Sequence, residues 1–257
     1  MTSAHLLEVR DIDVSFGGVH VLRSVDLDAN PGFTGLIGPN GAGKTTLFNV
    51  ISGYVAPKAG TVLLDGVEIQ GTTSLSVARS GVARTFQTPK LVGSMTLLDN
   101  AMLGIDGRKV EHPFFRAIGA PRTEKRLRAE ASEMLERFGL GNLLYQSVSS
   151  LSLGSQKIVE VARALLRQPR LLLLDEPAAG LSVTDVEALA KPLGEYADAG
   201  LAILIVEHDL ELVKRLCPEV IVLEFGRVIA TGPPHEVTQR PDVVAAYLGD
   251  ETLASRK

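Results

Sequence analysis

The segment that most constrains this chain is Gly38-Pro39-Asn40-Gly41-Ala42-Gly43-Lys44-Thr45, which fits the pattern G-x-x-x-x-G-K-[ST] in full. A short apolar stretch, residues 34–37, precedes it, and Leu47, Val50 and Ile51 follow at helical spacing. A strand, a glycine-rich turn and a helix in this order predict an α/β fold with the turn at the edge of a parallel sheet. A plain glycine-rich turn that matches by chance is the alternative.

The residue types in this segment suit the phosphates of a nucleotide. Glycines let the backbone curl so that its N–H groups face an anion at the positive end of the following helix. Lys44 adds a positive charge for the β- and γ-phosphates, and Thr45 offers a hydroxyl to Mg²⁺. The predicted nucleotide-binding set is Gly38, Pro39, Asn40, Gly41, Ala42, Gly43, Lys44, Thr45 and Thr46.

Strands are predicted on both sides of this loop. Residues 6–29 alternate apolar and polar side chains around Gly17-Gly18, and residues 61–69 place Asp65-Gly66 between apolar runs, which predicts antiparallel hairpins. Later in the chain, short continuous apolar runs separated by helical stretches are typical of a parallel sheet covered on both faces. These runs are residues 171–174, 201–206 and 220–223.

The stretch between these two groups of strands has a helical pattern. Thr123 is the expected N-cap of a helix that ends at Gly139, and a second helix ends before Pro169. We expect one domain over residues 1–257, with a core and antiparallel β-layer from about 1–90 and 169–257 and a helical insertion from about 91–168.

Composition excludes several classes of protein. The formal net charge of −4 gives no overall electrostatic case for nucleic-acid binding, so no nucleic acid is predicted as a partner. The single cysteine, Cys217, excludes an intrachain disulfide framework and reads as a small buried side chain near a helix end. Residues 1–10 show no secretory signal, and no run approaches the ~18 apolar residues that span a bilayer. We expect a soluble or peripheral protein.

A pair of carboxylates, Asp175-Glu176, ends the apolar run 171–174. Doubly wound sheets bind ligands at the C-terminal ends of their strands. We expect Asp175 to hold Mg²⁺ through water, and Glu176 to orient and deprotonate an attacking water. Two solvated acids at a strand end are the alternative, which the nearby phosphate loop makes the weaker interpretation.

Three further residues are candidates, each with an alternative. His208 directly follows the run 201–206, where it could hydrogen-bond the γ-phosphate or be an ordinary surface histidine. Gln87 could reach Mg²⁺ or the attacking water and report ligand state to the helical insertion, or be a solvated loop residue. Phe16 could stack on adenine or belong to the strand core.

The stretch Leu151-Ser152-Leu153-Gly154-Ser155-Gln156-Lys157 opens an amphipathic helix shortly before Asp175-Glu176. Its Ser-x-Gly segment resembles the signature motif of the ATP-binding cassette (ABC) family. The order of motifs is similar to that of ABC transporter ATPase subunits over nearly the whole chain: Phe16, the phosphate loop, Gln87, the signature-like stretch, Asp175-Glu176 and His208. Arg84-Thr85-Phe86-Gln87 and residues 225–232 and 246–249 resemble the branched-chain amino-acid (Liv-type) import subgroup.

This resemblance implies the P-loop NTPase fold of ABC ATPases, with ATP and Mg²⁺ as cofactors and ATP hydrolysis as the activity. Two ATPase subunits would close around two ATP molecules, and Ser152 and the Gly154 amide would face the γ-phosphate bound by the partner. Ser152 can also serve as an ordinary N-cap. The implied partners are an identical or homologous second ATPase subunit, membrane permeases and, indirectly, an extracytoplasmic solute-binding protein. The implied location is the cytoplasmic face of the cell membrane, and the implied solute is a branched-chain amino acid or a related polar compound.

The chain departs from the family pattern at a few positions. Leu153 and Ser155 stand where Gly and Gln are common, and Ser182 stands where many relatives have Asp. Residues 104–122 form an apolar and basic stretch that either packs locally or borders a permease-docking surface.

Two other classes of protein use a phosphate loop. A soluble ABC protein acting on ribosomes or DNA usually has two cassettes or long coiled coils, and neither is visible. A small-molecule kinase or GTPase is disfavoured by the signature-like stretch, and a GTPase also by the lack of Asn-Lys-x-Asp.

Overall fold

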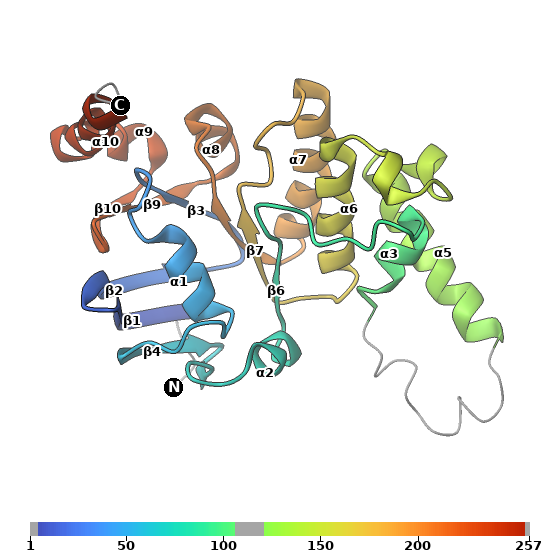
Figure 1. Cartoon of the computed structure of the whole chain (residues 1–257), viewed down its shortest axis with the longest axis horizontal. Coiled ribbons are helices and arrows are strands. Elements are labelled where there is room, and N and C mark those ends of the chain that lie inside the picture. The colour runs from blue at the N-terminus through green and yellow to red at the C-terminus, as the bar shows by residue number, and fades with distance from the viewer. Residues whose placement is uncertain (1–4, 106–120, 255–257) are drawn as a thin grey trace. The chain divides into compact units, whose positions relative to one another are not determined.

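The computed structural model describes residues 5–105 and 121–254 (Figure 1). They form two compact units. Unit 1 comprises Met1–Arg84, Arg170–Glu176 and Tyr196–Lys257, and unit 2 comprises Thr85–Pro169 and Pro177–Glu195. Most of the stretch 104–122 for which permease docking was considered lies outside the described residues.

A six-stranded sheet forms the centre of unit 1. All its strands are parallel except the edge strand β10 (Arg227–Gly232), which pairs antiparallel with β9 (Glu219–Glu224). This arrangement confirms the parallel sheet predicted from the apolar runs. In spatial order the strands are β10 (Arg227–Gly232), β9 (Glu219–Glu224), β3 (Gly32–Ile37), β8 (Ala202–Val206), β7 (Leu171–Asp175) and β6 (Val82–Arg84).

A second, antiparallel sheet confirms the predicted hairpins. Gly17 and Gly18 form the turn between β1 (Leu7–Phe16) and β2 (Val19–Ala29), and Asp65-Gly66 connects β4 (Ala59–Leu64) to β5 (Val67–Glu68). All four turn residues have positive φ, which the predicted two-residue turns require. In spatial order the strands are β2 (Val19–Ala29), β1 (Leu7–Phe16), β4 (Ala59–Leu64) and β5 (Val67–Glu68).

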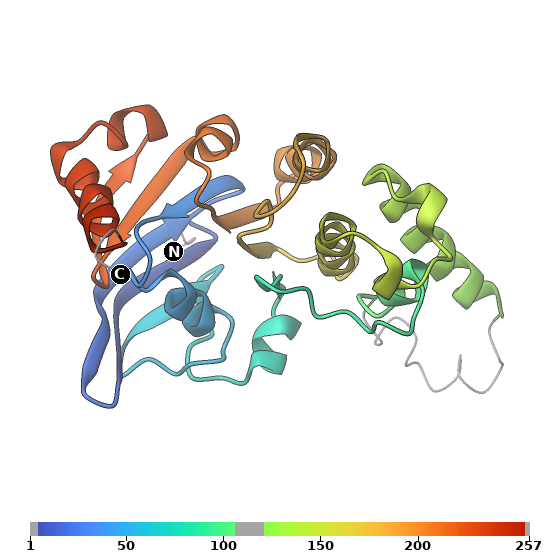
Figure 2. The same ribbon diagram turned by 45° about the horizontal axis from the view of Figure 1, so that its top comes forward.

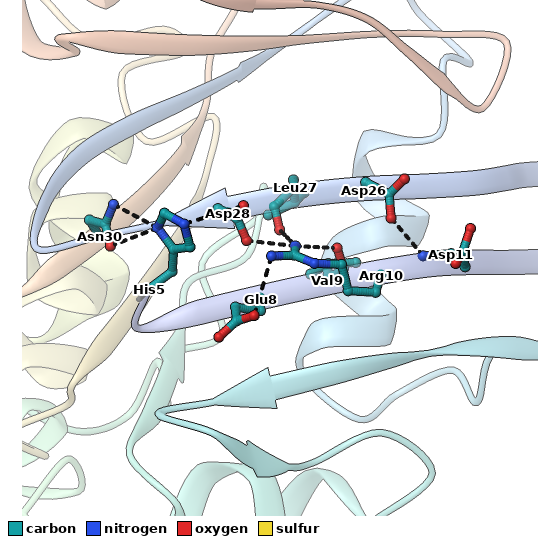
Figure 3. A network of polar contacts seen from close by, with 9 residues as sticks. All are labelled: His5, Glu8, Val9, Arg10, Asp11, Asp26, Leu27, Asp28 and Asn30. Carbon is teal, nitrogen blue, oxygen red and sulfur yellow. Dashed lines mark hydrogen bonds and ion pairs between the residues drawn. The ribbon is translucent and has the colours of Figure 1, made fainter. Parts of the chain in front are cut away.

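Polar side chains link β1 to β2 (Figure 3). The Arg10 guanidinium pairs with Asp28 of β2 at 2.6 Å and with Glu8 of its own strand at 3.2 Å. Nearby, the Asp11 amide donates to Asp26 Oδ1 at 2.8 Å. Asp11 has φ +51°, and the pairing of the two strands is irregular here. These contacts hold the register where the regular ladder is interrupted.

Helix α1 (Lys44–Ile51) links the cores of both sheets. Its Leu47, Phe48 and Ile51 side chains belong to one buried cluster with residues of β1, β2 and β4 and with residues of the parallel strands. The other face of the parallel sheet packs on α8 (Leu210–Leu216). The two elements are so close that a Cβ added at Gly35 of β3 would lie 3.2 Å from the Val213 side chain of α8. Helices α8, α9 (Pro234–Val237) and α10 (Pro241–Ala254) lie on one side of this sheet in both views (Figures 1 and 2). The sheet is therefore covered on both faces, as predicted.

Unit 2 is helical, as the pattern predicts. The second predicted helix is α6 (Leu153–Leu165), which ends before Pro169, and its apolar side chains Ile158, Val161 and Leu165 are buried. Thr123 is not an N-cap, because Pro121 already belongs to the helix, and proline is favoured in a first helical turn. The elements are α3 (Leu97–Met102), α5 (Pro121–Arg137), the 3₁₀ turns Gly141–Leu143 and Val148–Ser150, α6 (Leu153–Leu165), and α7 (Val183–Asp198), most of which lies in this unit; the short α2 (Ser74–Arg79) belongs to unit 1.

Cys217 ends helix α8 with its side chain 3% exposed, as predicted from the sequence. Burial raises the pKa of its thiol to about 12. Since the thiolate is the reactive form, we expect no alkylation of Cys217 by iodoacetamide at pH 8 in the folded protein and full alkylation in urea. Mass spectrometry of the intact protein measures this, and rapid labelling without denaturant would contradict it.

No helix in residues 5–105 and 121–254 combines the length and the apolar character that crossing a bilayer requires.

Candidate functional site

The loop 38–43 connects β3 to α1 in a conformation that its glycines permit. Gly38 has φ +148°, and a Cβ there would lie 2.0 Å from the carbonyl oxygen of Leu223. Gly43 is the N-cap of α1 with φ +109°, and no side chain caps the helix from that position. The first turn of α1 therefore keeps its backbone N–H groups for an anion.

Lys44 lies inside this loop. Its side chain is buried, and its ammonium donates to the carbonyl oxygens of Gly38 at 2.6 Å and Pro39 at 2.9 Å. Thr45, the next residue, is exposed at the start of α1. Lys44, which the loop's own carbonyls hold in place, fits the role predicted for a phosphate ligand. The exposed hydroxyl of Thr45 fits the role predicted for an Mg²⁺ ligand.

Two contacts that sequence analysis did not predict brace the loop. Gly226 lies in the turn between β9 and β10, and its amide donates to the Ala42 carbonyl at 2.9 Å. The Gly226 carbonyl accepts a hydrogen bond from the Arg23 amide at 2.8 Å. The hydroxyl of Tyr247 on α10 accepts a hydrogen bond from the Gly38 backbone, while burial raises the pKa of this phenol. Gly226 and Tyr247 stand out in the sequence only through the Liv-type resemblance of their segments.

Asp175 ends β7 with its carboxylate buried against Arg84 of β6. The Arg84 guanidinium donates to Asp175 Oδ2 at 3.1 Å, and these side chains are only 6% and 5% exposed. Burial raises the pKa of the Asp175 carboxyl, while the charge and hydrogen bond of Arg84 oppose that shift. The ion pair therefore helps to keep a carboxylate charged at the end of a buried strand.

Arg84 is a functional candidate that sequence analysis missed as an individual residue. It also donates to Asn49 Oδ1 at 2.7 Å and to Ser52 Oγ at 2.9 Å, both at the C-terminal end of α1. Its guanidinium carbon lies 5.6 Å from the centre of the Phe48 ring and 5.9 Å from that of Tyr54. Arg84 thus ties the strand end that carries Asp175 to the helix that follows the phosphate loop. The available signal was a charged residue directly after Val82-Ala83.

Glu176 and His208 are in direct contact. His208 Nε2 lies 2.8 Å from Glu176 Oε1, and the Glu176 amide donates to the Val206 carbonyl at 2.9 Å. Glu176 has φ +51°, an uncommon backbone conformation for this residue type that occurs often at functional sites. The structure therefore brings two predicted residues together at the ends of adjacent parallel strands.

Phe16 is not a core residue. It ends β1 with half of its surface exposed, so the strand-core alternative is wrong. Adenine stacking on this ring stays a prediction.

Unit 2 holds the other predicted residues. Gln87 is exposed in a segment without regular structure. Ser152 caps α6, because its hydroxyl accepts the Ser155 amide at 3.1 Å, which confirms the N-cap alternative. Gly154 is buried, and a Cβ there would lie 2.9 Å from a carboxylate oxygen of Asp185.

The two unusual serines have local partners. The Ser155 hydroxyl lies 3.1 Å from the Ser152 hydroxyl. The Ser182 hydroxyl accepts the Asp185 amide at 3.2 Å at the start of α7, so Ser182 acts as a helix cap, a role that Asp also fills well.

The donor groups in unit 1 fit Mg²⁺ bound together with a nucleotide. Mg²⁺ commonly uses one or two protein oxygens plus waters and phosphate oxygens, and Thr45 and Asp175 supply a hydroxyl and a carboxylate. Within the described part of the chain, no group of three or more His, Cys, Asp or Glu residues could hold a metal ion alone.

Residues 22–179 match the family model described as ABC transporter, and residues 227–252 match one described as branched-chain amino acid ATP-binding cassette transporter. This chain belongs to the ABC transporter ATPase family. It is the ATP-binding subunit of an ABC transporter, and the reaction it catalyses is ATP hydrolysis.

Similar proteins indicate which subgroup of ABC transporters the chain resembles. The high-affinity branched-chain amino acid transport ATP-binding protein LivG of Escherichia coli K12 is 36% identical over 258 residues, covering 96% of this chain and 99% of that protein. The corresponding protein BraF of Pseudomonas aeruginosa is 35% identical over 254 residues with the same coverage. Both are transport subunits, so a soluble protein acting on ribosomes or DNA is not favoured.

Solved structures confirm the predicted fold. The ADP conformation of MJ1267, an ATP-binding cassette of an ABC transporter, matches with a TM-score of 0.83 at 30% identity, covering 96% of this chain and 100% of that chain. A nucleotide-free ATP-binding cassette from an ABC transporter matches with a TM-score of 0.82 at 30% identity, covering 94% and 98%.

Proposed function

We propose that unit 1 carries the hydrolytic half of the ATP site. Glu176 is the general base that activates the attacking water, and His208 holds this carboxylate and responds to the γ-phosphate. The assignment rests on the 2.8 Å contact between His208 Nε2 and Glu176 Oε1, because Glu176 directly follows Asp175 at the end of β7. Lys44 and the loop amides bind the phosphates, and Phe16 stacks on adenine.

Mg²⁺ belongs to the same proposal. Thr45, Asp175 and Gln87 would hold it, directly or through water, and the bound ion would neutralise charge on the phosphates during hydrolysis. Arg84 would keep the Asp175 carboxylate oriented and ionised for this role.

Loss of the Lys44 charge should weaken nucleotide binding. We expect Lys44→Ala to lower ATP affinity by about tenfold or more, because a hydrogen bond to a charged group contributes about 1.5–3 kcal/mol. Titration with a fluorescent ATP analogue measures this, with Lys214→Ala, a partly exposed lysine on α8, as the control. Equal affinity in the Lys44 variant and the native protein would contradict the phosphate role.

We further propose that the N-terminus of α6 serves a nucleotide bound by another ATPase subunit. Ser152 and the Gly154 amide would face that subunit's γ-phosphate, because a helix start favours an anion. The closed pair, formed with an identical or homologous subunit, would drive membrane permeases from the cytoplasmic face of the cell membrane. Co-purification of permease subunits with the tagged chain tests this arrangement, and isolation of the chain alone from solubilised membranes would contradict it.

The proposed direction of transport is import, and the proposed solute is a branched-chain amino acid. The match of residues 227–252 and the names of the similar proteins support this choice. Thermal unfolding of the associated solute-binding protein with single amino acids tests it, because a ligand at about 100 times its Kd adds about 2.7 kcal/mol of stability. Leucine, isoleucine or valine should raise the Tm and glutamate should not. A shift with urea or an amide alone would reassign the solute.

A further inference from the structure

Glu160 is a buried carboxylate on α6 that none of the roles above uses. It is 2% exposed, although it lies two helical turns after the exposed Ser152. A buried charge is strongly disfavoured unless hydrogen bonds and an opposite charge compensate it. Its partners therefore indicate what the residue is for.

The hydrogen-bond partners of Glu160 lie in one segment, residues 86–90, which has no regular secondary structure, and its ion-pair partner Arg163 contacts the same segment. Glu160 Oε2 accepts the Phe86 amide at 3.3 Å, and Oε1 accepts the Lys90 amide at 3.0 Å. Arg163, one turn later on α6, pairs with Glu160 at 3.5 Å and donates to the Lys90 carbonyl at 2.7 Å. Two side chains of one helix thus hold both ends of the segment that contains Gln87.

We propose that Glu160 and Arg163 form a clamp that fixes residues 86–90 to α6, so that Glu160 is a positioning residue for Gln87. The backbone on both sides of Gln87 is held by one carboxylate, which limits where its side chain can reach. Because α6 is a continuous helix, the clamp also makes Ser152 and Gln87 move together. Its functional meaning rests on the proposed role of Gln87 at the ATP site.

Lys157 provides a matched comparison on the same helix. It is buried as well, and its ammonium donates to the Ala179 carbonyl at 2.7 Å, in the segment that follows Glu176. Lys157 and Glu160 are one helical turn apart but bind different segments. A variant at Lys157 therefore removes a buried charge of α6 but keeps the contacts of Glu160 and Arg163 with residues 86–90.

Hydrogen exchange of the full chain, read by mass spectrometry, tests the clamp itself. In Glu160→Gln, whose amide group cannot accept both backbone N–H groups as the carboxylate does, the Phe86 and Lys90 amides should exchange at least about tenfold faster. Lys157→Met should leave exchange of these two amides unchanged. Native-like exchange at residues 86–90 in a folded Glu160→Gln protein would overturn the proposal. If that variant does not fold, Arg163→Met tests the other half of the clamp. It removes the bond to the Lys90 carbonyl and the charge partner of Glu160, so residues 86–90 should open more often and the Lys90 amide should exchange faster.

A double-mutant cycle tests whether Glu160 acts through Gln87. If it does, ATP turnover in Gln87→Ala with Glu160→Gln should be no lower than in Gln87→Ala alone. Losses that multiply would overturn the positioning role. Unchanged turnover in Gln87→Ala would instead remove Gln87 from the proposed ATP site, and hydrogen exchange would still decide whether the clamp exists.

Discussion

Glu176→Gln should lower ATP turnover by about 10²–10⁴-fold while ATP affinity stays within the error of the native value. The amide has the shape of the carboxylate and can keep a hydrogen bond to His208, but it cannot accept a proton from water. Binding depends on the phosphate loop, whose contacts with Leu223 and Gly226 do not involve position 176. Steady-state phosphate release and titration with an ATP analogue measure the two properties separately.

Glu211→Gln on α8 is the control for this change. Its carboxylate is largely exposed and pairs with Lys214, so the same substitution there should leave turnover unchanged. We also expect Glu176→Gln to accumulate an ATP-bound closed pair of subunits, which size-exclusion chromatography with and without ATP detects. Native turnover in the Glu176 variant would remove this residue from the general-base role.

Loss of Arg84 should destabilise unit 1. We expect Arg84→Met to lower the free energy of unfolding by about 3–5 kcal/mol, because the Asp175 carboxylate stays buried without its ion-pair partner. Asn49 and Ser52 lose a donor in the same change. Urea unfolding followed by circular dichroism measures the loss.

A second substitution separates the buried charge from general packing. Adding Asp175→Asn to Arg84→Met removes the buried charge that has lost its ion pair with Arg84, so the double variant should regain part of the stability lost in the single one. Equal midpoints for Arg84→Met and the native protein would show that the pair does not stabilise unit 1. Arg240→Met, at an ion pair with Asp242 in which both side chains are exposed, should cost less.

Local patterns predicted most of the fold. Continuous apolar runs predicted β7, β8 and β9, and two-residue turns predicted the hairpins. Both signals, hydrophobic periodicity and turn residues, depend on only a few neighbouring residues. Strand β6 was missed since Val82–Arg84 is too short to show a period. Thr123 failed as a cap because a proline two residues earlier already lies in the helix.

The site was predictable to the extent that its motifs are continuous in sequence. The phosphate loop and Asp175-Glu176 are local patterns, and His208 was suggested by its position directly after the apolar run 201–206. Arg84 and Glu160 were not predictable as partners, because Arg84 lies 91 positions from Asp175 and Glu160 lies 70 and 74 positions from the amides it holds. A charged residue in an apolar stretch signals that a partner exists, but only the folded chain identifies it.

We propose that this chain hydrolyses ATP to drive solute uptake. The most direct measurement is uptake of radiolabelled leucine into proteoliposomes that hold the permeases and this subunit, with ATP on the subunit's side and the solute-binding protein on the other. We expect uptake that requires ATP, is lost with Glu176→Gln and persists with Glu211→Gln. ATP hydrolysis by the native complex without uptake of leucine, isoleucine, valine or any solute that the binding protein recognises would contradict this proposal.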